Sequence, residues 1–328
     1  MPVEGHASAR PSRPLFAEGL PATAEDLLGS DVLSWRQERK GLGGEPGALD
    51  WLLDVAAGVS PVRLRAMLLH PARPVRLRCS LPELDRLWRA HLTEAVPLQY
   101  LVGRCYWRDF SVEVGPGVLI PRPETETMVD LAVALLREDG TQRAHDLLWA
   151  DLGTGSGCLA MGLARAFPGC RGLAVDVSPV ALGQARRNLS RADPHSRVHL
   201  IQGDWFEAIE PWWGALSLVV ANPPYIPSEV VDRLDPVVRD HEPRLALDGG
   251  GDGLACIRSL AMGAPRALAA GGWLLLEHHH DQSRAVMDLL VRHGLVDVQS
   301  HPDLEGQRRF VSGRLSPSMP RLTAGRRP

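Results

Sequence analysis

The feature that most constrains the fold is the segment LLWADLGTGSGCLAMGLAR at residues 147–165. An apolar run leads into three alternating glycines (Gly153, Gly155 and Gly157), and apolar residues at helical spacing follow. This order predicts a buried strand, a tight loop and a helix. Glycines at the carboxyl end of a strand let the backbone turn sharply and let a ligand lie against bare main chain. The segment therefore predicts a parallel sheet with a ligand site at its carboxyl edge.

The rest of the C-terminal half repeats the alternation of strand and helix. Apolar runs predict strands over 147–153, 171–178, 198–206, 216–225 and 272–279. Helical spacing predicts helices over Pro179–Asn188, Leu254–Ala270 and Ser283–His293, and VDVQSHPD and RRFVSGRL are expected to pair as an antiparallel hairpin. Strands alternating with helices favour an α/β domain with a mainly parallel, doubly wound sheet, expected over residues 126–315.

The N-terminal third has a different pattern. Residues 1–22 are rich in Pro, Ala, Ser and Gly, which is typical of a disordered extension. Residues 23–96 show helical spacing, with helices expected over 24–39 and 48–57 and from Pro61 and Pro82, so a small helical domain is predicted. Residues 97–125 read as a β-hairpin linker with a helix starting near Glu124, and residues 316–328 read as a disordered tail.

Composition excludes several classes of protein. The 328 residues carry 36 basic and 39 acidic side chains, a net charge of −3, which argues against non-specific binding of nucleic acid. No apolar run reaches the roughly 18 residues of a membrane span, and the N-terminus lacks an apolar leader, so a cytoplasmic protein is expected. The five cysteines are scattered and the three histidines at 278–280 are adjacent, so reduced thiols and no metal site are expected.

The glycine loop alone is compatible with NAD, FAD or S-adenosylmethionine. Its spacing is GxGxG, whereas dinucleotide enzymes use GxGxxG. Asp151 precedes the loop, where it could accept from a ligand ammonium group and would repel a pyrophosphate. Asp176 ends the next strand, where it could bind ribose hydroxyls or compete with Ser178 to cap a helix. Asp204 and Trp205 end the third strand, where an adenine would lie, although Trp205 could equally be a core residue.

A second motif, Asn222-Pro223-Pro224-Tyr225, follows the apolar strand LSLVVA. Two prolines fix the backbone, and this rigidity would hold the Asn222 side-chain oxygen and the Pro223 carbonyl as two acceptors in one cleft. Such a pair suits a planar –NH₂ group, and Tyr225 offers a stacking face. The chemistry indicated is methyl transfer to an amide or exocyclic amino nitrogen. The structural alternative is a rigid loop with ordinary turn chemistry.

Together these motifs resemble the protein-(glutamine-N5) methyltransferases of the HemK/PrmC family, over roughly residues 25 to 314. The resemblance is strongest in PLQYLVGRCYWRDFSVEVGPGVLIPRPETE (97–126), DLGTGSG (151–157), GDWF (203–206) and ANPPYIP (221–227), with EPRLALDGGGDGL (242–254) also similar. The first block is the most discriminating, because DNA and RNA amino-methyltransferases share NPPY without it.

The resemblance implies a class I S-adenosylmethionine-dependent methyltransferase with a seven-stranded sheet and a helical N-terminal domain. S-adenosylmethionine would be the cofactor, and the acceptor would be the glutamine of a Gly-Gly-Gln motif in a peptide-chain release factor. The residues expected at the cofactor are Asp151, Gly153, Thr154, Gly155, Ser156, Gly157, Asp176, Asp204, Trp205 and Asn222. Those expected at the substrate are Asn222, Pro223, Pro224 and Tyr225, with Arg122, Pro123, Glu124 and Thr125 near the cleft.

One position departs from the family pattern. After the fifth strand the family shows E-x-G-x-x-Q, and here His279 stands at the glycine position between Glu277 and Gln282. A backbone with positive φ at that position would make histidine costly. The three histidines themselves are expected on a surface loop.

Three other functions remain open from the sequence. They are glutamine methylation of a ribosomal protein, amino-methylation of a DNA or RNA base, and hydride transfer with NAD. Residues 61–92 hold seven arginines against Glu83 and Asp85. This basic excess is either an ordinary solvated face or a docking surface for a protein substrate. A monomer without direct nucleic-acid contact is expected.

Overall fold

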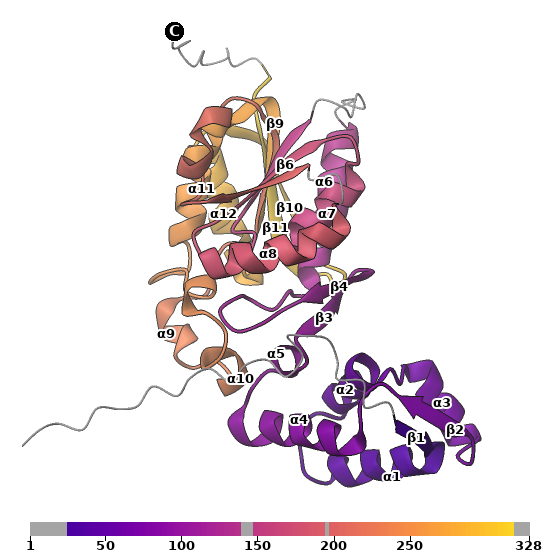
Figure 1. The fold of residues 1–328 in the computed structure, drawn as a ribbon. Helices are drawn as coiled ribbons and strands as arrows, with labels where there is room; N and C mark the ends of the chain where they lie inside the picture. The colour runs from indigo at the N-terminus through magenta and orange to yellow at the C-terminus, as the bar shows by residue number, and fades with distance from the viewer. Residues whose placement is uncertain (1–24, 139–146, 194–196, 318–328) are drawn as a thin grey trace, which may run out of the picture. The chain divides into compact units, whose positions relative to one another are not determined.

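The computed structural model describes residues 25–138, 147–193 and 197–317, which form two compact units that divide between Arg104 and Cys105 (Figure 1). The boundary falls within the segment predicted as a linker. The predicted extension over 1–22 and nearly all of the predicted tail over 316–328 lie outside the described residues.

The N-terminal unit is mainly helical, as predicted. Its helices are α1 (Gly29–Lys40), α2 (Pro46–Ala57), α3 (Pro61–Leu69), α4 (Leu81–Glu94) and α5 (Leu98–Val102). The Ser60 hydroxyl accepts from the Arg63 amide, so α3 begins at Pro61 for the reason that the sequence indicates. Its fully buried core includes Trp88, the leucines of α2, and Leu84 and Leu87 of α4.

The unit also contains a small sheet that the sequence reading missed. Strands β1 (Glu25–Leu28) and β2 (Pro74–Leu77) pair antiparallel, so the helix expected from Ala24 begins only at Gly29. Each strand has four residues, which is too short for its alternation to stand out, and the partner lies about fifty positions away. Residues 98–102 likewise form helix α5 where extended structure was expected.

The second unit is built on a seven-stranded sheet, which confirms the predicted doubly wound α/β fold. The strand order is β10-β11-β9-β8-β5-β6-β7. The strands are β5 (Leu148–Leu152), β6 (Arg171–Asp176), β7 (Val198–Gln202), β8 (Leu216–Ala221), β9 (Leu268–Glu277), β10 (Leu295–Pro302) and β11 (Arg308–Leu315). Strands β5 to β9 run parallel, and β11 is antiparallel to both of its neighbours.

Helices cover both faces of this sheet. Figure 1 shows α6 (Thr127–Glu138) and α7 (Cys158–Ala166) on one side, and α11 (Ala255–Ala267) and α12 (Ser283–Arg292) on the other. Helix α8 (Pro179–Ala192) packs against α7. The remaining elements are the hairpin β3 (Arg104–Trp107) and β4 (Phe110–Glu113), the short helices α9 (Ser228–Val231) and α10 (Pro236–Arg239), and the 3₁₀ turns η1 (Glu124–Glu126), η2 (Glu207–Trp212), η3 (Arg244–Ala246) and η4 (His280–Gln282).

The register brings the functional segments to one edge of the sheet. Leu152 pairs with Val175 on one side and with Ala221 on the other, and Ala221 also pairs with Leu276. The residues that follow, which are Gly153, Asp176, Asn222 and Glu277, therefore lie at the same carboxyl edge. Strand β7 ends at Gln202, four residues earlier than expected, so Asp204 and Trp205 lie in the loop beyond it.

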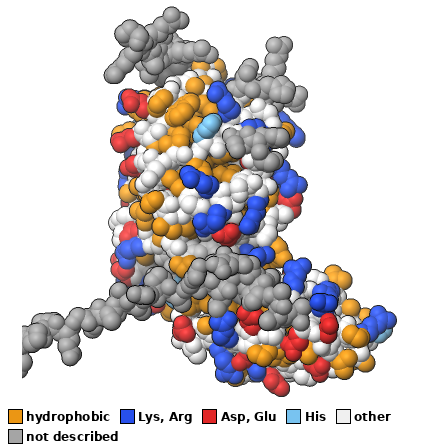
Figure 2. All heavy atoms as spheres, viewed as in Figure 1, with side chains coloured by type: hydrophobic (Ala, Val, Ile, Leu, Met, Phe, Trp, Pro, Cys, Tyr) orange, Lys and Arg blue, Asp and Glu red, His pale blue; other side chains and the backbone are white. Residues whose placement is uncertain are grey.

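The charge distribution and the helices both bear on the expected class of protein. On the face shown in Figure 2, basic and acidic side chains are interspersed over both units. Within the three described segments, no helix has the length and apolar character needed to cross a membrane.

Candidate active site

A cavity of about 260 Å³ opens at the carboxyl edge of the sheet, beside the ends of β5 and β8. The chain order of the strands reverses there, and such a switch point is the usual ligand site of an open α/β sheet. The predicted residues on its wall are Arg122, Thr125, Asp151, Gly153, Thr154, Gly155, Ser156, Asp176, Asp204, Trp205, Asn222 and Pro224. Those that do not line it are Pro123, Glu124, Gly157, Pro223 and Tyr225.

The glycine loop has the backbone that its sequence indicates. Gly153, Gly155 and Gly157 have φ angles of +77°, +56° and +81°, in the left-handed region that favours glycine. The amides of Gly153 and Thr154 both donate to the Val175 carbonyl at 2.9 Å, which ties the loop to β6. A Cβ on Gly155 would meet nothing within 4 Å, so this part of the main chain is bare toward the cavity.

The Asp176 carboxylate holds this loop in place through hydrogen bonds to backbone amides. One carboxylate oxygen accepts from the Gly155 amide at 2.8 Å, and the other accepts from the Ser178 amide at 2.9 Å. The capping role belongs to Ser178, whose hydroxyl accepts from the Ala181 amide at the start of α8. Because each carboxylate oxygen has two lone pairs, Asp176 keeps acceptor capacity on the cavity wall for a ligand hydroxyl. Burial raises its pKa above the ordinary value.

Asp151 is a buried carboxyl that has no cationic partner within the described segments. It is 1% exposed, and its carboxylate accepts from the Thr154 hydroxyl at 2.7 Å and from the Ala160 amide. Burial raises the pKa of Asp151 to about 7, and the neighbouring charge of Asp176 adds to that increase. A cationic group of a ligand in the cavity would satisfy this carboxylate.

Trp205 lies both on the cavity wall and against the core. Its φ of +35° is unusual for a non-glycine residue. A Cβ on Gly153 would lie 3.2 Å from the Trp205 ring, so the indole packs directly on the glycine loop. The ring also packs against the core between the sheet and α11, and Trp205 lines the cavity.

The NPPY turn is held by a hydrogen-bonded chain. The Asn222 side-chain NH₂ donates to the Thr125 hydroxyl oxygen at 3.0 Å, and the Thr125 hydroxyl donates to Glu277 Oε2 at 2.7 Å. The Tyr225 hydroxyl lies 3.3 Å from Glu277 Oε1. The Gln282 side-chain NH₂ donates to the Tyr225 carbonyl at 3.0 Å. With its NH₂ committed to Thr125, Asn222 has its side-chain oxygen left as an acceptor.

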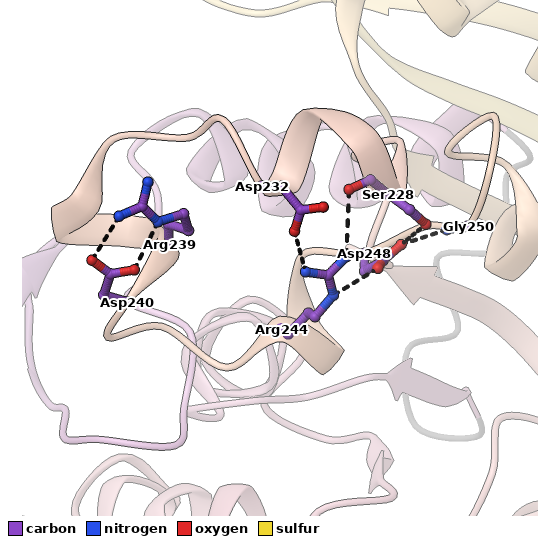
Figure 3. A network of polar contacts seen from close by, with 7 residues as sticks. All are labelled: Ser228, Asp232, Arg239, Asp240, Arg244, Asp248 and Gly250. Carbon is purple, nitrogen blue, oxygen red and sulfur yellow. Dashed lines mark hydrogen bonds and ion pairs between the residues drawn. The ribbon is translucent and has the colours of Figure 1, made fainter.

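The segment after the NPPY turn is fixed by a second polar network (Figure 3). Arg244 donates to Asp232 at 2.5 Å and to Asp248 at 3.0 Å. Asp248 also accepts from the Ser228 hydroxyl at 2.6 Å and from the Gly250 amide at 2.9 Å. These contacts hold η3 and its flanks in place, where Pro243, Leu245, Ala246 and Asp248 complete the cavity wall.

Arg122 joins the two walls of the cavity. Its guanidinium pairs with the buried carboxylate of Glu242 at 2.6 Å, and the other Glu242 oxygen accepts from the Ile120 amide at 3.1 Å. The residues at 117–125 are thereby linked to the segment that follows the NPPY turn.

The histidine at the family's glycine position causes no strain. His279 has φ −66° and ψ 143°, which is ordinary extended backbone, so the expected penalty does not arise. Its amide donates to Gln282 Oε1 at 3.0 Å, and its ring pairs with Asp281 at 2.7 Å. The substitution is therefore compatible with the same turn and with the Gln282 contact to Tyr225.

The sequence reading did not assign Glu242, Glu277 or Gln282 to the site. Glu277 had a detectable signal, since it ends the apolar strand GWLLLE next to the strand that carries NPPY. A carboxylate at the carboxyl end of a buried strand is typical of a site residue. Glu242 had no comparable signal, because its partner lies 120 positions away.

A mostly parallel seven-stranded sheet with one antiparallel strand, a glycine loop after its central strand and an NPPY turn define a class I methyltransferase. A family model described as "Methyltransferase small domain" matches residues 125–249.

The chain is 46% identical over 280 residues to the release factor glutamine methyltransferase of Prochlorococcus marinus, covering 85% of this chain and 94% of that protein. It is 41% identical over 264 residues to the release factor glutamine methyltransferase of Thermosynechococcus vestitus, covering 80% of this chain and 89% of that protein. The crystal structure of a release factor-specific protein-(glutamine-N5) methyltransferase from Alicyclobacillus acidocaldarius is 29% identical, with a TM-score of 0.37, over 62% of this chain and 99% of that one. On the sequence identities, the chain belongs to the release factor glutamine methyltransferase family.

Proposed function

We propose that this protein transfers a methyl group from S-adenosylmethionine to the side-chain amide nitrogen (N5) of a glutamine in a peptide-chain release factor. The names of its relatives support this acceptor. The observation that carries the chemistry is the Asn222 amide, whose NH₂ is held by Thr125 at 3.0 Å while its oxygen is left as an acceptor on the cavity wall.

The residues on the cavity wall suit S-adenosylmethionine, which supplies a methyl group bound to a sulfonium. Asp151 would accept from the ammonium group and Asp176 from ribose hydroxyls, while Trp205 would contact the adenine. The bare main chain at Gly155 admits a ligand without a steric clash. The buried Asp151 carboxyl without a cationic partner is the feature that fits a zwitterionic cofactor best.

The NPPY turn would hold the acceptor glutamine. An amide nitrogen is a poor nucleophile because its lone pair is delocalised. The Asn222 side-chain oxygen and the Pro223 carbonyl would accept its two N–H bonds and orient the nitrogen toward the methyl group. Because positive charge develops on the nitrogen, both hydrogen bonds strengthen in the transition state. No general base is required to start the transfer.

The test is transfer of label from tritiated S-adenosylmethionine to a purified release factor, a ribosome or DNA, offered separately. We expect label in the release factor and a loss of about 10²–10³-fold in kcat for Asn222→Ala, comparable to removal of an oxyanion-hole donor. Arg239→Ala serves as a control, because Arg239 is exposed and donates to the exposed Asp240, away from the cavity wall.

Each outcome of the labelling experiment is decisive. Label only in a ribosomal protein or only in nucleic acid would replace the proposed acceptor, and unchanged turnover by Asn222→Ala would disprove the role of the NPPY turn. Stabilisation of the fold by NAD but not by S-adenosylmethionine would overturn methyl transfer altogether. A monomeric state, a cytoplasmic location and the lack of nucleic-acid contact stay predictions.

A further inference from the structure

Two buried side chains lie directly behind the proposed methyl-transfer site. Thr125 is 3% exposed and Glu277 is 1% exposed. They come from η1 and from the end of β9, 152 positions apart. Glu277 accepts from Thr125 and from Tyr225, so a single carboxylate is linked to both ends of the NPPY turn.

The polarity of this chain of hydrogen bonds is set at Glu277. An ionised carboxylate can only accept, so the single hydroxyl proton of Thr125 must point toward Glu277 at 2.7 Å. Thr125 then has only lone pairs to offer Asn222, and the side-chain NH₂ of Asn222 must face Thr125. It follows that the side-chain oxygen of Asn222 is presented on the opposite side.

The alternative arrangement shows why this polarity matters. Without an acceptor behind it, the Thr125 hydroxyl could donate to the Asn222 oxygen, and the Asn222 amide could rotate to present its NH₂ to the cavity. A donor would then face the N–H of the substrate amide, and the acceptor needed for methyl transfer would be lost. Hydrogen bonds in such a chain also polarise one another, so a negative charge at one end strengthens the acceptor at the other.

We propose that Glu277 is a positioning residue for methyl transfer, which acts through the Thr125 hydroxyl to fix and polarise the Asn222 side-chain amide with its oxygen toward the substrate nitrogen. This inference rests on the proposed function and deepens it, because it assigns a role to Glu277, a buried residue that is not on the cavity wall.

The electrostatic surroundings make this role dependent on pH. Burial is the main cause that raises the pKa of Glu277 to about 7, and the nearby charge of Glu124 raises it further. Arg309, itself paired with Asp303 at 2.7 Å, and the hydrogen bonds from Thr125 and Tyr225 act in the opposite direction. A protonated Glu277 can donate, and the direction of the chain is then no longer fixed. Activity should therefore rise as Glu277 ionises.

The kinetic test compares Glu277→Gln, Thr125→Val and Thr125→Ser with the wild type between pH 5.5 and 8.5. We expect the first two variants to lose about tenfold or more in kcat at pH 8. For Glu277→Gln, the KM for the release factor and the Kd for S-adenosylmethionine should stay within about twofold, because Glu277 is not on the cavity wall and the loss lies in the transition state. Thr125→Ser keeps the hydroxyl and should restore most of the rate. The rise of kcat through about pH 7 should vanish in Glu277→Gln.

A second readout does not depend on turnover. The side-chain NH₂ signals of Asn222, assigned by their loss in Asn222→Asp, should shift in ¹H–¹⁵N NMR spectra with a midpoint near pH 7 in the wild type. They should not shift in Glu277→Gln or Thr125→Val. A wild type that labels no release factor would defeat the proposed function, and the NMR titration would still decide the inference. Wild-type kcat and pH profile in Glu277→Gln, or an Asn222 signal that does not titrate, would overturn it.

Discussion

Asp151 shows at the scale of a single residue how a site can reduce the stability of its own fold. Its carboxyl is buried against Thr154 with no cationic partner among the described residues, and its pKa of about 7 lies well above the ordinary 3.8. A raised pKa means that the folded state binds the proton more tightly than the unfolded state. Below about pH 4 the resulting stabilisation is fully present, and it is lost as the pH rises through 7.

This predicts a stabilising substitution at the site. Asp151→Asn should leave the ligand-free protein more stable than the wild type at pH 8, with an upper bound of about 4 kcal/mol, because the neutral amide pays no cost of charge burial. Its Tm, measured by thermal unfolding from pH 5 to 8, should fall less than that of the wild type. Its affinity for S-adenosylmethionine should drop. Asp240→Asn, at an exposed ion pair, is the control, and an equal fall of Tm in Asp151→Asn would contradict the argument.

The structure brings predicted site residues together where a polar side chain follows the end of a strand, and their roles stay predictions. Asp176, Trp205 and Asn222 all lie on the cavity wall, because the parallel register brings the ends of β6, β7 and β8 to one edge. Glu277 was overlooked because its partners, Thr125 and Tyr225, come from distant parts of the chain. No local sequence pattern indicates that Glu277 and Asn222, at the ends of two different strands, will both hydrogen-bond to the Thr125 hydroxyl.

At the scale of the element, two glycines of the loop are needed for different reasons. Both have a backbone that favours glycine, but only one of them faces the cavity. Gly155 and Gly157 both have positive φ, but the space around them differs. A Cβ on Gly157 would lie 3.0 Å from the Cβ of Ala185 in α8, whereas one on Gly155 would meet no protein atom within 4 Å. Gly155 lines the cavity and Gly157 does not.

The two positions make a matched pair for mutation. Gly155→Ala should cost about 1 kcal/mol of stability from backbone strain and should weaken binding of S-adenosylmethionine, because the new methyl group enters the cavity. Gly157→Ala should lose more stability, since steric overlap with α8 adds to the strain. Thermal unfolding and calorimetric titration of both variants check this. A larger loss of Tm in Gly155→Ala than in Gly157→Ala would contradict it.

Elements were predictable where their signals were long. The five residues of β5 are all buried and are apolar except for Asp151, and the last four residues of β8 are both buried and apolar. The strands β1 and β2 and the five-residue helix α5 were missed, because each is too short to show its period. Their structure depends on pairing and packing within the N-terminal unit and not on their own propensity.

At the scale of the whole molecule, the net charge is close to neutral, but the arginines of residues 61–92 differ in whether they form ion pairs. Of the seven arginines at 61–92, Arg86 pairs with Glu83 and Arg89 with Asp85. The other five form no ion pair within the described part of the chain, and these are Arg63, Arg65, Arg73, Arg76 and Arg78. Arg76 lies on the exposed side of β2, between the buried Val75 and Leu77, and Arg78 is exposed directly after the strand ends.

We expect these arginines to contribute to docking of the protein substrate. Reversal of both charges, Arg76→Glu with Arg78→Glu, should raise KM for the release factor several-fold at low salt while kcat stays unchanged, because exposed charges act over about 10 Å at 0.1 M salt. Initial rates at low and high salt measure the effect. The control is the double variant Arg233→Glu with Arg292→Glu, which changes the net charge by the same amount but in the other unit. An unchanged KM at low salt would identify residues 61–92 as an ordinary solvated surface.

The position of β11 has a consequence for synthesis of the chain. This strand, Arg308–Leu315, comes last along the chain among the strands of the described residues, but it lies inside the sheet, between β9 and β10. Its neighbour β9 ends in Glu277, which anchors Thr125 and Tyr225. A ribosome that has translated only as far as β10 has therefore made every residue of the cavity wall, yet the sheet still lacks an interior strand. We expect the site to reach its final form only after β11 has emerged from the ribosome and joined the sheet between β9 and β10.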